Sequence, residues 1–291
     1  MKLGITSTPY LNKYGIAEGA AKMKKHGYSC IDYQGFVDIK GKMLSLSENE
    51  RKAELTLMRM MVENEGLCFN QAHSPWRYPP RDLDPADRNE WLEAMIKSIR
   101  GSAYLGAKLF VVHPLMPFGA NSAENPEEMK SINFEFFNTL AECGKEYDVT
   151  VCLENMPFPL LPITTVAQVL ETVKAVNSDY FKVCLDTGHT LVCGSTLYDS
   201  VMLLGNEYLA ALHVHDNDGT ADRHLRPYEG IGDWRAFSDA LEKIGFEGTF
   251  SLETDPLKGT DEVTQQENEI TLATVGARLA KIIDEGEKLC Q

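Results

Sequence analysis

The 291-residue chain is 43% hydrophobic and carries a formal net charge of −15. This composition supplies a large core, whereas no apolar stretch reaches the roughly 18 residues that a membrane-spanning helix requires. The negative charge repels the phosphate backbone of nucleic acids. We therefore expect neither a membrane nor a nucleic acid as a partner.

The start of the chain and its cysteines indicate the compartment. Residues 1–8 begin with a predicted strand and lack the cationic start and long apolar run of a secretory signal. The seven cysteines show no metal-finger spacing. Four of them lie inside predicted strands: Cys30, Cys68, Cys152 and Cys184. Such residues are typical of reduced, buried cysteines in a cytoplasmic protein.

Predicted strands and amphipathic helices alternate along the whole chain. The strands are expected near residues 2–6, 29–33, 67–73, 108–113, 150–154, 181–186, 209–215 and 248–253. The helices are expected near residues 16–26, 48–65, 85–105, 127–147, 165–176, 197–206, 234–244 and 263–288.

A glycine separates a helix from the next strand at four junctions: Gly27, Gly66, Gly106 and Gly245. Glycine adopts the left-handed conformation that ends a helix and returns the chain to the sheet. Eight strands and eight helices predict an α/β fold, a (β/α)8 TIM barrel that forms a single domain over residues 1–291. The alternative is a doubly wound open sheet, which does not require ligand-type residues at so many strand ends.

Six predicted strands end on a side chain suited to bind a metal. These side chains are His73, His113, Glu154, Asp186, His213 and Glu253. The carboxyl ends of the parallel strands of a barrel meet at one face, so these residues are expected to converge there. The pattern predicts an enzyme with a metal-centred site. One acid alone, such as Glu154, would more simply cap the next helix, but the other five weaken that interpretation.

Asp186 and His189 lie three residues apart on a predicted tight turn. Both are placed to reach one cation, or Asp186 binds the cation while His189 contacts substrate. In the alternative interpretation, Asp186 only organises the turn by accepting hydrogen bonds from backbone amides. The two interpretations have equal weight on this motif alone.

The densest polar run begins at His213. His215 follows at the alternate position and shares its face of the strand. Asp222 and His224 add another carboxylate and imidazole in the next loop. Six of the seven histidines fall within strand-end motifs, and only His26 looks like an ordinary surface histidine. A polar loop with incidental histidines is therefore the weaker interpretation.

The remaining motifs belong to the predicted rim. His73 and His113 could bind a second cation or hold polar groups of a substrate. Trp76 offers an apolar face to a sugar ring, although packing within the rim is slightly favoured. Asp233 is a good N-cap for the helix that starts at Trp234.

A site of carboxylates plus one imidazole is mixed in hardness. Oxygen ligands with one imidazole suit Mn²⁺, Mg²⁺ or Co²⁺, whereas additional histidines favour Zn²⁺. We expect one divalent metal ion, with Mn²⁺ as the first choice.

These motifs resemble the xylose-isomerase-like barrel superfamily, which contains sugar isomerases, keto-sugar 3-epimerases and endonuclease IV. The resemblance spans nearly the whole chain, and its most specific parts are residues 153–155, 186–189, 213–234 and 252–253. By similarity to the epimerases, the metal ligands would be Glu154, Asp186, His213 and Glu253. Glu154 and Glu253 would also exchange the substrate proton, and His189 would contact substrate.

The resemblance bears on the choice between His213 and His215. The ligand histidine of the family stands three residues before an acidic residue, as His213 stands before Asp216, so His213 is preferred. We expect the other polar residues and Trp76 to line the pocket and bind substrate hydroxyls or a phosphate: His73, Trp76, His113, His189, His215, Asp222 and His224.

The chain departs from the epimerases in one segment. The epimerases carry a further glutamate shortly after the first ligand, whereas residues 156–160 are apolar here, which implies a different grip on the substrate. Endonuclease IV binds three metals through residues that match nine positions of this chain: His73, His113, Glu154, Asp186, His189, His213, Asp222, His224 and Glu253. An abasic-site endonuclease is therefore an alternative, against which the net charge argues.

The expected function is that of a metal-dependent sugar isomerase or epimerase. The cation would stabilise the enediolate formed when a proton leaves the carbon α to a carbonyl. One glutamate would remove the proton, and the other would return it on the opposite face. A lyase or dehydratase acting on a keto-inositol or keto-glycoside begins with the same step and ranks next, ahead of the endonuclease and of a barrel that only binds sugar. The expected partner is a small sugar-derived molecule, and a homo-oligomer is compatible with this function.

Overall fold

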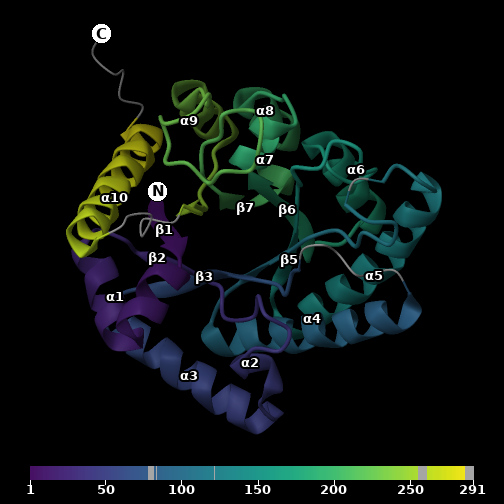
Figure 1. Ribbon diagram of the computed structural model, residues 1–291, viewed down its shortest axis with the longest axis horizontal. Coiled ribbons are helices and arrows are strands. Elements are labelled where there is room, and N and C mark those ends of the chain that lie inside the picture. The colour runs from purple at the N-terminus through teal and green to yellow at the C-terminus, as the bar shows by residue number, and fades with distance from the viewer. Residues whose placement is uncertain (78–81, 83, 121, 255–260, 286–291) are drawn as a thin grey trace.

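The computed structural model describes the chain except for residues 78–81, 83, 121, 255–260 and 286–291. Eight parallel strands form a central barrel, and helices surround it (Figure 1). The strands are β1 Lys2–Thr6, β2 Cys30–Tyr33, β3 Cys68–His73, β4 Leu109–Val112, β5 Thr150–Glu154, β6 Phe181–Asp186, β7 Leu209–His213 and β8 Thr249–Leu252.

The strands pair in the order β7-β6-β5-β4-β3-β2-β1-β8. A short parallel contact between β7 and β8 closes the circle. The amide of Val214 donates to the carbonyl of Ser251 at 2.8 Å, and the amide of Glu253 donates to the carbonyl of Val214 at 3.0 Å. The predicted TIM barrel is confirmed, and the doubly wound open sheet is wrong because its edge strands would remain apart.

Each of the eight predicted helices is present in the described part of the chain. They are α1 Ile16–Lys25, α3 Glu48–Asn64, α4 Pro85–Leu105, α5 Pro126–Tyr147, α6 Val166–Val176, α8 Leu197–Tyr208, α9 Trp234–Ile244 and α10 Glu262–Glu285. Three short helices were not predicted: η1 Thr8–Asn12, α2 Lys42–Ser45 and α7 Thr187–Val192. No helix of the described residues is both long and apolar enough to cross a membrane.

Three sequence-based expectations need correction. The segment after Asp186 is not a tight turn but the first turn of α7, because the Asp186 carboxylate accepts a hydrogen bond from the His189 amide at 2.6 Å and caps the helix. The strand expected over residues 209–215 ends at His213, so His215 lies beyond it. Cys68 is also only partly buried, unlike Cys30.

The helix ends follow the predicted local chemistry. Gly106 and Gly245 cap α4 and α9 with φ values of 79° and 67°, and Gly27 and Gly66 also have positive φ. Asp233 caps α9 by accepting a hydrogen bond from the amide of Ala236 at 3.0 Å. These capping residues fix where each helix stops and where the following strand begins.

The alternation of side chains along the strands positions the candidate site. Small residues of four neighbouring strands pack together without helix residues: Val111, Cys152, Cys184 and Ala211. Alternate residues of a strand face the same side. Two residues further along, the same four rows continue into His113, Glu154, Asp186 and His213. These polar side chains therefore extend the interior of the barrel towards its carboxyl end.

Candidate active site

A cavity of about 150 Å³ opens at the carboxyl ends of the strands. Its polar lining comes mostly from strand ends and from the loop after β7, with two further residues between β3 and α4: His73, His113, Glu154, His189, Asp222, His224, Glu253, Arg77 and Asp82. Its apolar lining comes from α4 and the loops after β3, β4 and β5: Pro75, Trp76, Trp91, Pro114, Met116, Met156, Pro157 and Phe158. The site thus combines a polar floor with an apolar rim.

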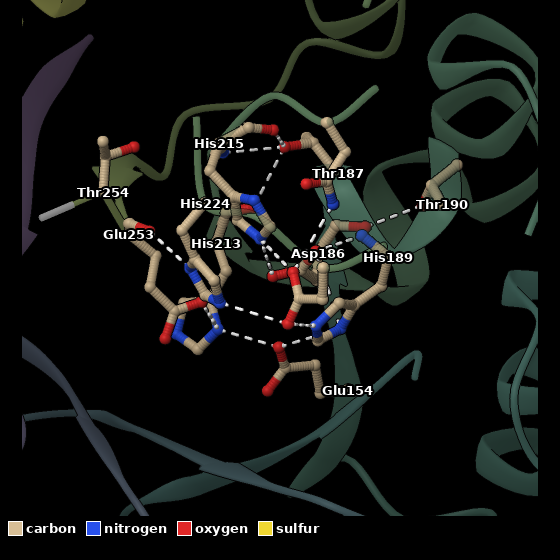
Figure 2. A network of polar contacts seen from close by, with 12 residues as sticks. Glu154, Asp186, Thr187, His189, Thr190, His213, His215, His224, Glu253 and Thr254 are labelled. Atoms are coloured by element: carbon tan, nitrogen blue, oxygen red, sulfur yellow. Dashed lines mark hydrogen bonds and ion pairs between the residues drawn. The ribbon is translucent and has the colours of Figure 1, made fainter. Parts of the chain in front are cut away.

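The first group of candidate ligands lies at the ends of β5 to β8. Glu154, Asp186, His213 and Glu253 each offer one ligand atom, and these atoms lie within 4.8 Å of one another. His213 Nδ1 is 3.0 Å from Glu154 Oε1 and 3.2 Å from Glu253 Oε2. Figure 2 shows these side chains pointing towards one another. The sequence-predicted ligand set is therefore brought together by the fold.

The second oxygen of Glu154 faces a second group. Glu154 Oε2 lies 3.1 Å from Nε2 of His113 and 3.6 Å from Nε2 of His73. The rings of His73 and His113 meet edge to face, with centroids 4.9 Å apart. Glu154 is thus shared between two clusters of possible ligands.

The third group consists of His189, His215, Asp222 and His224. Asp222 Oδ2 lies 3.2 Å from Nε2 of His189 and 3.2 Å from Nε2 of His224. The rings of His215 and His224 are stacked with centroids 4.1 Å apart. His215 Nε2 also contacts Asp186 Oδ2 at 2.9 Å, which connects this group to the first.

The donor set fits a divalent cation. Carboxylate oxygens and imidazole nitrogens are the ligands that Mn²⁺ and Zn²⁺ use in proteins. Each of these three groups, and a fourth formed by His73, His213 and Glu253, contains at least one carboxylate and one imidazole. His215 Nδ1 is buried and has no hydrogen-bond partner among the described residues. These carboxylates and imidazoles outnumber the polar side chains that the ends of the helices and strands need for their own stability.

Burial and neighbouring charges shift the pKa values of the two glutamates in opposite directions. Burial opposes ionisation of Glu154, but His213 and His113 outweigh it and hold the pKa of this carboxyl well below its usual range. Burial raises the pKa of the Glu253 carboxyl above its usual value, although His213 and His224 oppose the shift. Two carboxyl groups with different proton affinities at one site are the arrangement that acid–base chemistry uses.

The loop between β7 and α9 carries Asp222 and His224, and Asp216 organises it. The buried Asp216 carboxylate accepts hydrogen bonds from the amides of Gly230 and Gly232 at 3.0 Å each and from Trp234 Nε1 at 2.9 Å. A Cβ atom at Gly230 would lie 2.2 Å from the carbonyl oxygen of Asn217, so this close approach requires glycine. Asp216 therefore acts on the loop rather than as a ligand.

All eleven sequence-predicted site residues lie around this mouth, and their individual roles stay predictions. His215 is fully buried behind the cavity surface, against His224. Trp76 lines the cavity with 46% of its surface exposed. His26, assigned to the surface from the sequence, lies elsewhere and contacts the hydroxyl of Tyr10 through Nδ1 at 2.9 Å.

Sequence reasoning missed Asp32 at the end of β2. Its Oδ2 atom lies 3.1 Å from Nε2 of His213, and the residue is fully buried. The sequence carried only a partial signal, because a carboxylate follows the apolar run Cys30-Ile31 but Tyr33 continues the strand after it. Trp91 and Met116 were also missed, since they reach the cavity only through tertiary packing.

A parallel barrel with carboxylates and imidazoles at the carboxyl ends of its strands defines a TIM-barrel protein with a candidate metal site. Residues 20–272 match the family described as Xylose isomerase-like TIM barrel, and the chain belongs to this family.

Two sequence relatives illustrate the range of the family. An uncharacterised protein of Methanocaldococcus jannaschii, MJ1311, is 30% identical over 190 residues, which cover 62% of this chain and 64% of that protein. The match thus spans less than two thirds of that relative. A probable endonuclease 4 of Clostridium botulinum is 25% identical over 215 residues, which cover 70% of this chain and 73% of that protein.

Solved structures with the same fold include keto-sugar 3-epimerases. A D-psicose 3-epimerase crystallised in the presence of D-fructose superposes with a TM-score of 0.76 at 19% sequence identity. The superposition covers 96% of this chain and 99% of that chain. At this identity the likeness shows the fold alone.

Proposed function

We propose that the protein is a metal-dependent sugar isomerase or epimerase that removes a proton from the carbon α to a carbonyl. The observation that carries the proposal is that Glu154 and Glu253 both approach one imidazole nitrogen, at 3.0 Å and 3.2 Å from His213 Nδ1. Both glutamates line the cavity. A substrate carbon held between them has one carboxylate to take a proton and another to return it.

The first ligand group would hold one divalent cation, for which we propose Mn²⁺ because three of its four members are carboxylates: Glu154, Asp186, His213 and Glu253. The bound cation would supply positive charge that stabilises an enediolate. The remaining polar residues of the cavity would bind substrate hydroxyls or a phosphate, and His215 would orient His224 by stacking on it.

The apolar rim bears on the substrate. We propose that Trp76 packs its indole against the apolar face of a sugar ring. Met156 and Phe158 follow Glu154 in the segment where the epimerases carry a further glutamate, so this wall offers contact to carbon and not a carboxylate. A keto-glycoside lyase would start with the same proton abstraction, and its aglycone would suit such a wall.

Solvent exchange tests the proposed chemistry. The Mn²⁺-loaded protein, incubated in deuterated water with keto-sugars, keto-inositols and keto-glycosides, should place deuterium at the carbon α to the carbonyl of its substrate. Glu154→Gln and Glu253→Gln should each stop net conversion. Glu247→Gln is the matched control, because Glu247 is exposed and precedes β8 at its amino end, away from the cavity. Absence of exchange across the whole panel would refute the proposal.

A second candidate function is a metal-dependent phosphodiesterase of the endonuclease IV type. It is favoured by the second and third groups, which hold His73, His113, His189, Asp222 and His224 in ligand-like clusters. Against it stands the net charge of −15. In addition, the Arg77 guanidinium is engaged with Asp82 at 3.6 Å and lies over the Trp91 ring, 4.4 Å from its centroid.

Incision of DNA separates the two candidates. With Zn²⁺ supplied, an endonuclease would cut abasic duplex DNA at low enzyme concentration, and His113→Ala would abolish the cut. We expect no such incision and no shift of the duplex in a gel at physiological salt, since the acidic chain lacks the long-range attraction that DNA binding uses. Efficient cutting would promote the phosphodiesterase and displace the sugar isomerase.

A further inference from the structure

Asp32 is a buried carboxylate that the proposed reaction does not use. It stands near the end of β2, where the pairing with β3 changes register: Ile31 pairs with Phe69, but Asp32 pairs with Gln71. Such a bulge at the rim of a barrel redirects side chains. Here it places Asp32 and Gln71 beside each other, with Gln71 Nε2 3.3 Å from Asp32 Oδ2.

The carboxylate of Asp32 is held by a set of donors. Gln34 Nε2 donates to Asp32 Oδ2 at 3.2 Å, in addition to Gln71. Asn70 Nδ2 donates to Gln71 Oε1 at 3.0 Å, which keeps the amide nitrogen of Gln71 turned towards Asp32. Asp32 Oδ1 has no hydrogen-bond partner among the described residues. The network therefore holds Asp32 Oδ2 in place, next to a neighbouring side chain.

That neighbour is the ring of His213. Nε2 of His213 lies 3.1 Å from Asp32 Oδ2, while Nδ1 faces Glu154 and Glu253. An ionised carboxylate only accepts hydrogen bonds, so Nε2 carries the proton and donates it to Asp32. Nδ1 faces the Glu154 carboxylate and would release its own proton when a cation binds, so its lone pair would serve the metal while Asp32 keeps the proton on Nε2.

We propose that Asp32 is a positioning residue for the metal site. It fixes the tautomer and orientation of His213 and makes Nδ1 a stronger metal donor, as carboxylates behind metal-bound histidines do. It touches neither substrate nor metal. The same contact distinguishes His213 from His215, whose Nε2 already meets Asp186 and whose Nδ1 has no partner among the described residues. This inference rests on the proposed metal-dependent function.

Calorimetric titration with Mn²⁺ alone tests the role of Asp32. Asp32→Ala should weaken Mn²⁺ binding by about 10- to 100-fold, the range found when such supporting groups are removed. Asp32→Asn should weaken it less, because an amide oxygen still accepts from His213 Nε2. Glu269→Gln is the matched control: Glu269 is equally buried, but it lies on α10, where it accepts a hydrogen bond from Tyr14. It should leave Mn²⁺ affinity unchanged.

A second readout does not depend on metal. In the metal-free protein, nitrogen-15 NMR should show His213 protonated at Nε2, and Asp32→Ala should alter that tautomer. A wild-type ring without a proton on Nε2, or Mn²⁺ affinity within twofold of wild type in both Asp32 variants, would overturn the inference. So would an equal loss of affinity in Glu269→Gln, which would reveal general destabilisation.

The same titration separates this inference from the proposed metal site. If His213→Ala binds Mn²⁺ as tightly as the wild type does, the metal site itself is wrong. If His213→Ala loses binding while the Asp32 variants keep it, only the role of Asp32 is wrong. If the Asp32 variants behave as expected but no keto-sugar exchanges deuterium, the role of Asp32 holds and the proposed reaction fails.

Discussion

Asn155 joins the ends of β5 and β6 through a reciprocal pair of hydrogen bonds with the backbone of Asp186. Its Oδ1 accepts from the Asp186 amide at 2.8 Å, and its Nδ2 donates to the Asp186 carbonyl at 3.0 Å. Both residues are buried. Asn155 thus fixes the position of one candidate ligand, Asp186, relative to another, Glu154.

Asn155→Ala should therefore cost both stability and metal binding. Each buried polar group left without a partner costs about 1–3 kcal/mol, so we expect a loss of roughly 3 kcal/mol in the free energy of unfolding, measured in urea. Mn²⁺ affinity should also fall because Asp186 is no longer aligned. The control is Asn138→Ala, whose amide donates to the Phe134 carbonyl within α5. Unchanged metal affinity in Asn155→Ala would show that β6 holds Asp186 without help.

The ligand assignment makes a second prediction. Asp186→Ala and His213→Ala should each lower the bound metal per chain, measured by elemental analysis, and abolish turnover while circular dichroism shows an intact barrel. His26→Ala should retain full metal, because His26 lies outside the site. If His215→Ala loses the metal and His213→Ala retains it, the assignment of the two histidines must be reversed.

The sequence allowed the barrel and the ligand clusters to be predicted because both depend on local signals. Apolar runs, helical spacing and glycine caps mark each element, and the alternation of side chains carries His113, Glu154, Asp186 and His213 to one face. Parallel pairing then brings them together without any further information about tertiary contacts.

The features that were missed depend on more than local pattern. Asp32 is followed by Tyr33 in the same strand, so it does not mark an obvious strand end. His215 alternates with His213, but the strand stops at His213, and only the fold shows that His215 turns towards Asp186. In the sequence, Asp216 served only to identify His213 as the ligand histidine. Its hydrogen bonds to the following loop are seen only in the folded chain.

Asp216 supports a third prediction. Asp216→Ala removes the acceptor for Trp234 Nε1 and for the amides of Gly230 and Gly232. Because several donors lose their partner, the free energy of unfolding should fall by about 4 kcal/mol or more. Substrate binding should weaken as well, since the loop carries Asp222. Asp218→Ala is the control: Asp218 lies in the same loop but bonds near the surface to Thr220. A stable Asp216→Ala variant would show that the loop is held from elsewhere.

A fourth prediction tests whether Trp76 stacks on the substrate or packs within the rim. Its ring is 46% exposed, and its centroid lies 6.2 Å from that of His113, so Trp76→Ala should reduce the free energy of unfolding by less than about 1 kcal/mol. If the indole packs on the sugar, KM should rise with little change in kcat, and kcat/KM should fall about fivefold, as expected for an aromatic contact worth roughly 1 kcal/mol.

Leu57→Ala provides the matched control for Trp76→Ala. Leu57 is another large exposed apolar side chain, but it lies on α3, outside the cavity lining. Steady-state kinetics on whichever keto-sugar shows solvent exchange gives the comparison. If Trp76→Ala leaves KM unchanged and instead destabilises the fold by several kcal/mol, the tryptophan packs within the rim and the sugar ring is held by the polar floor alone.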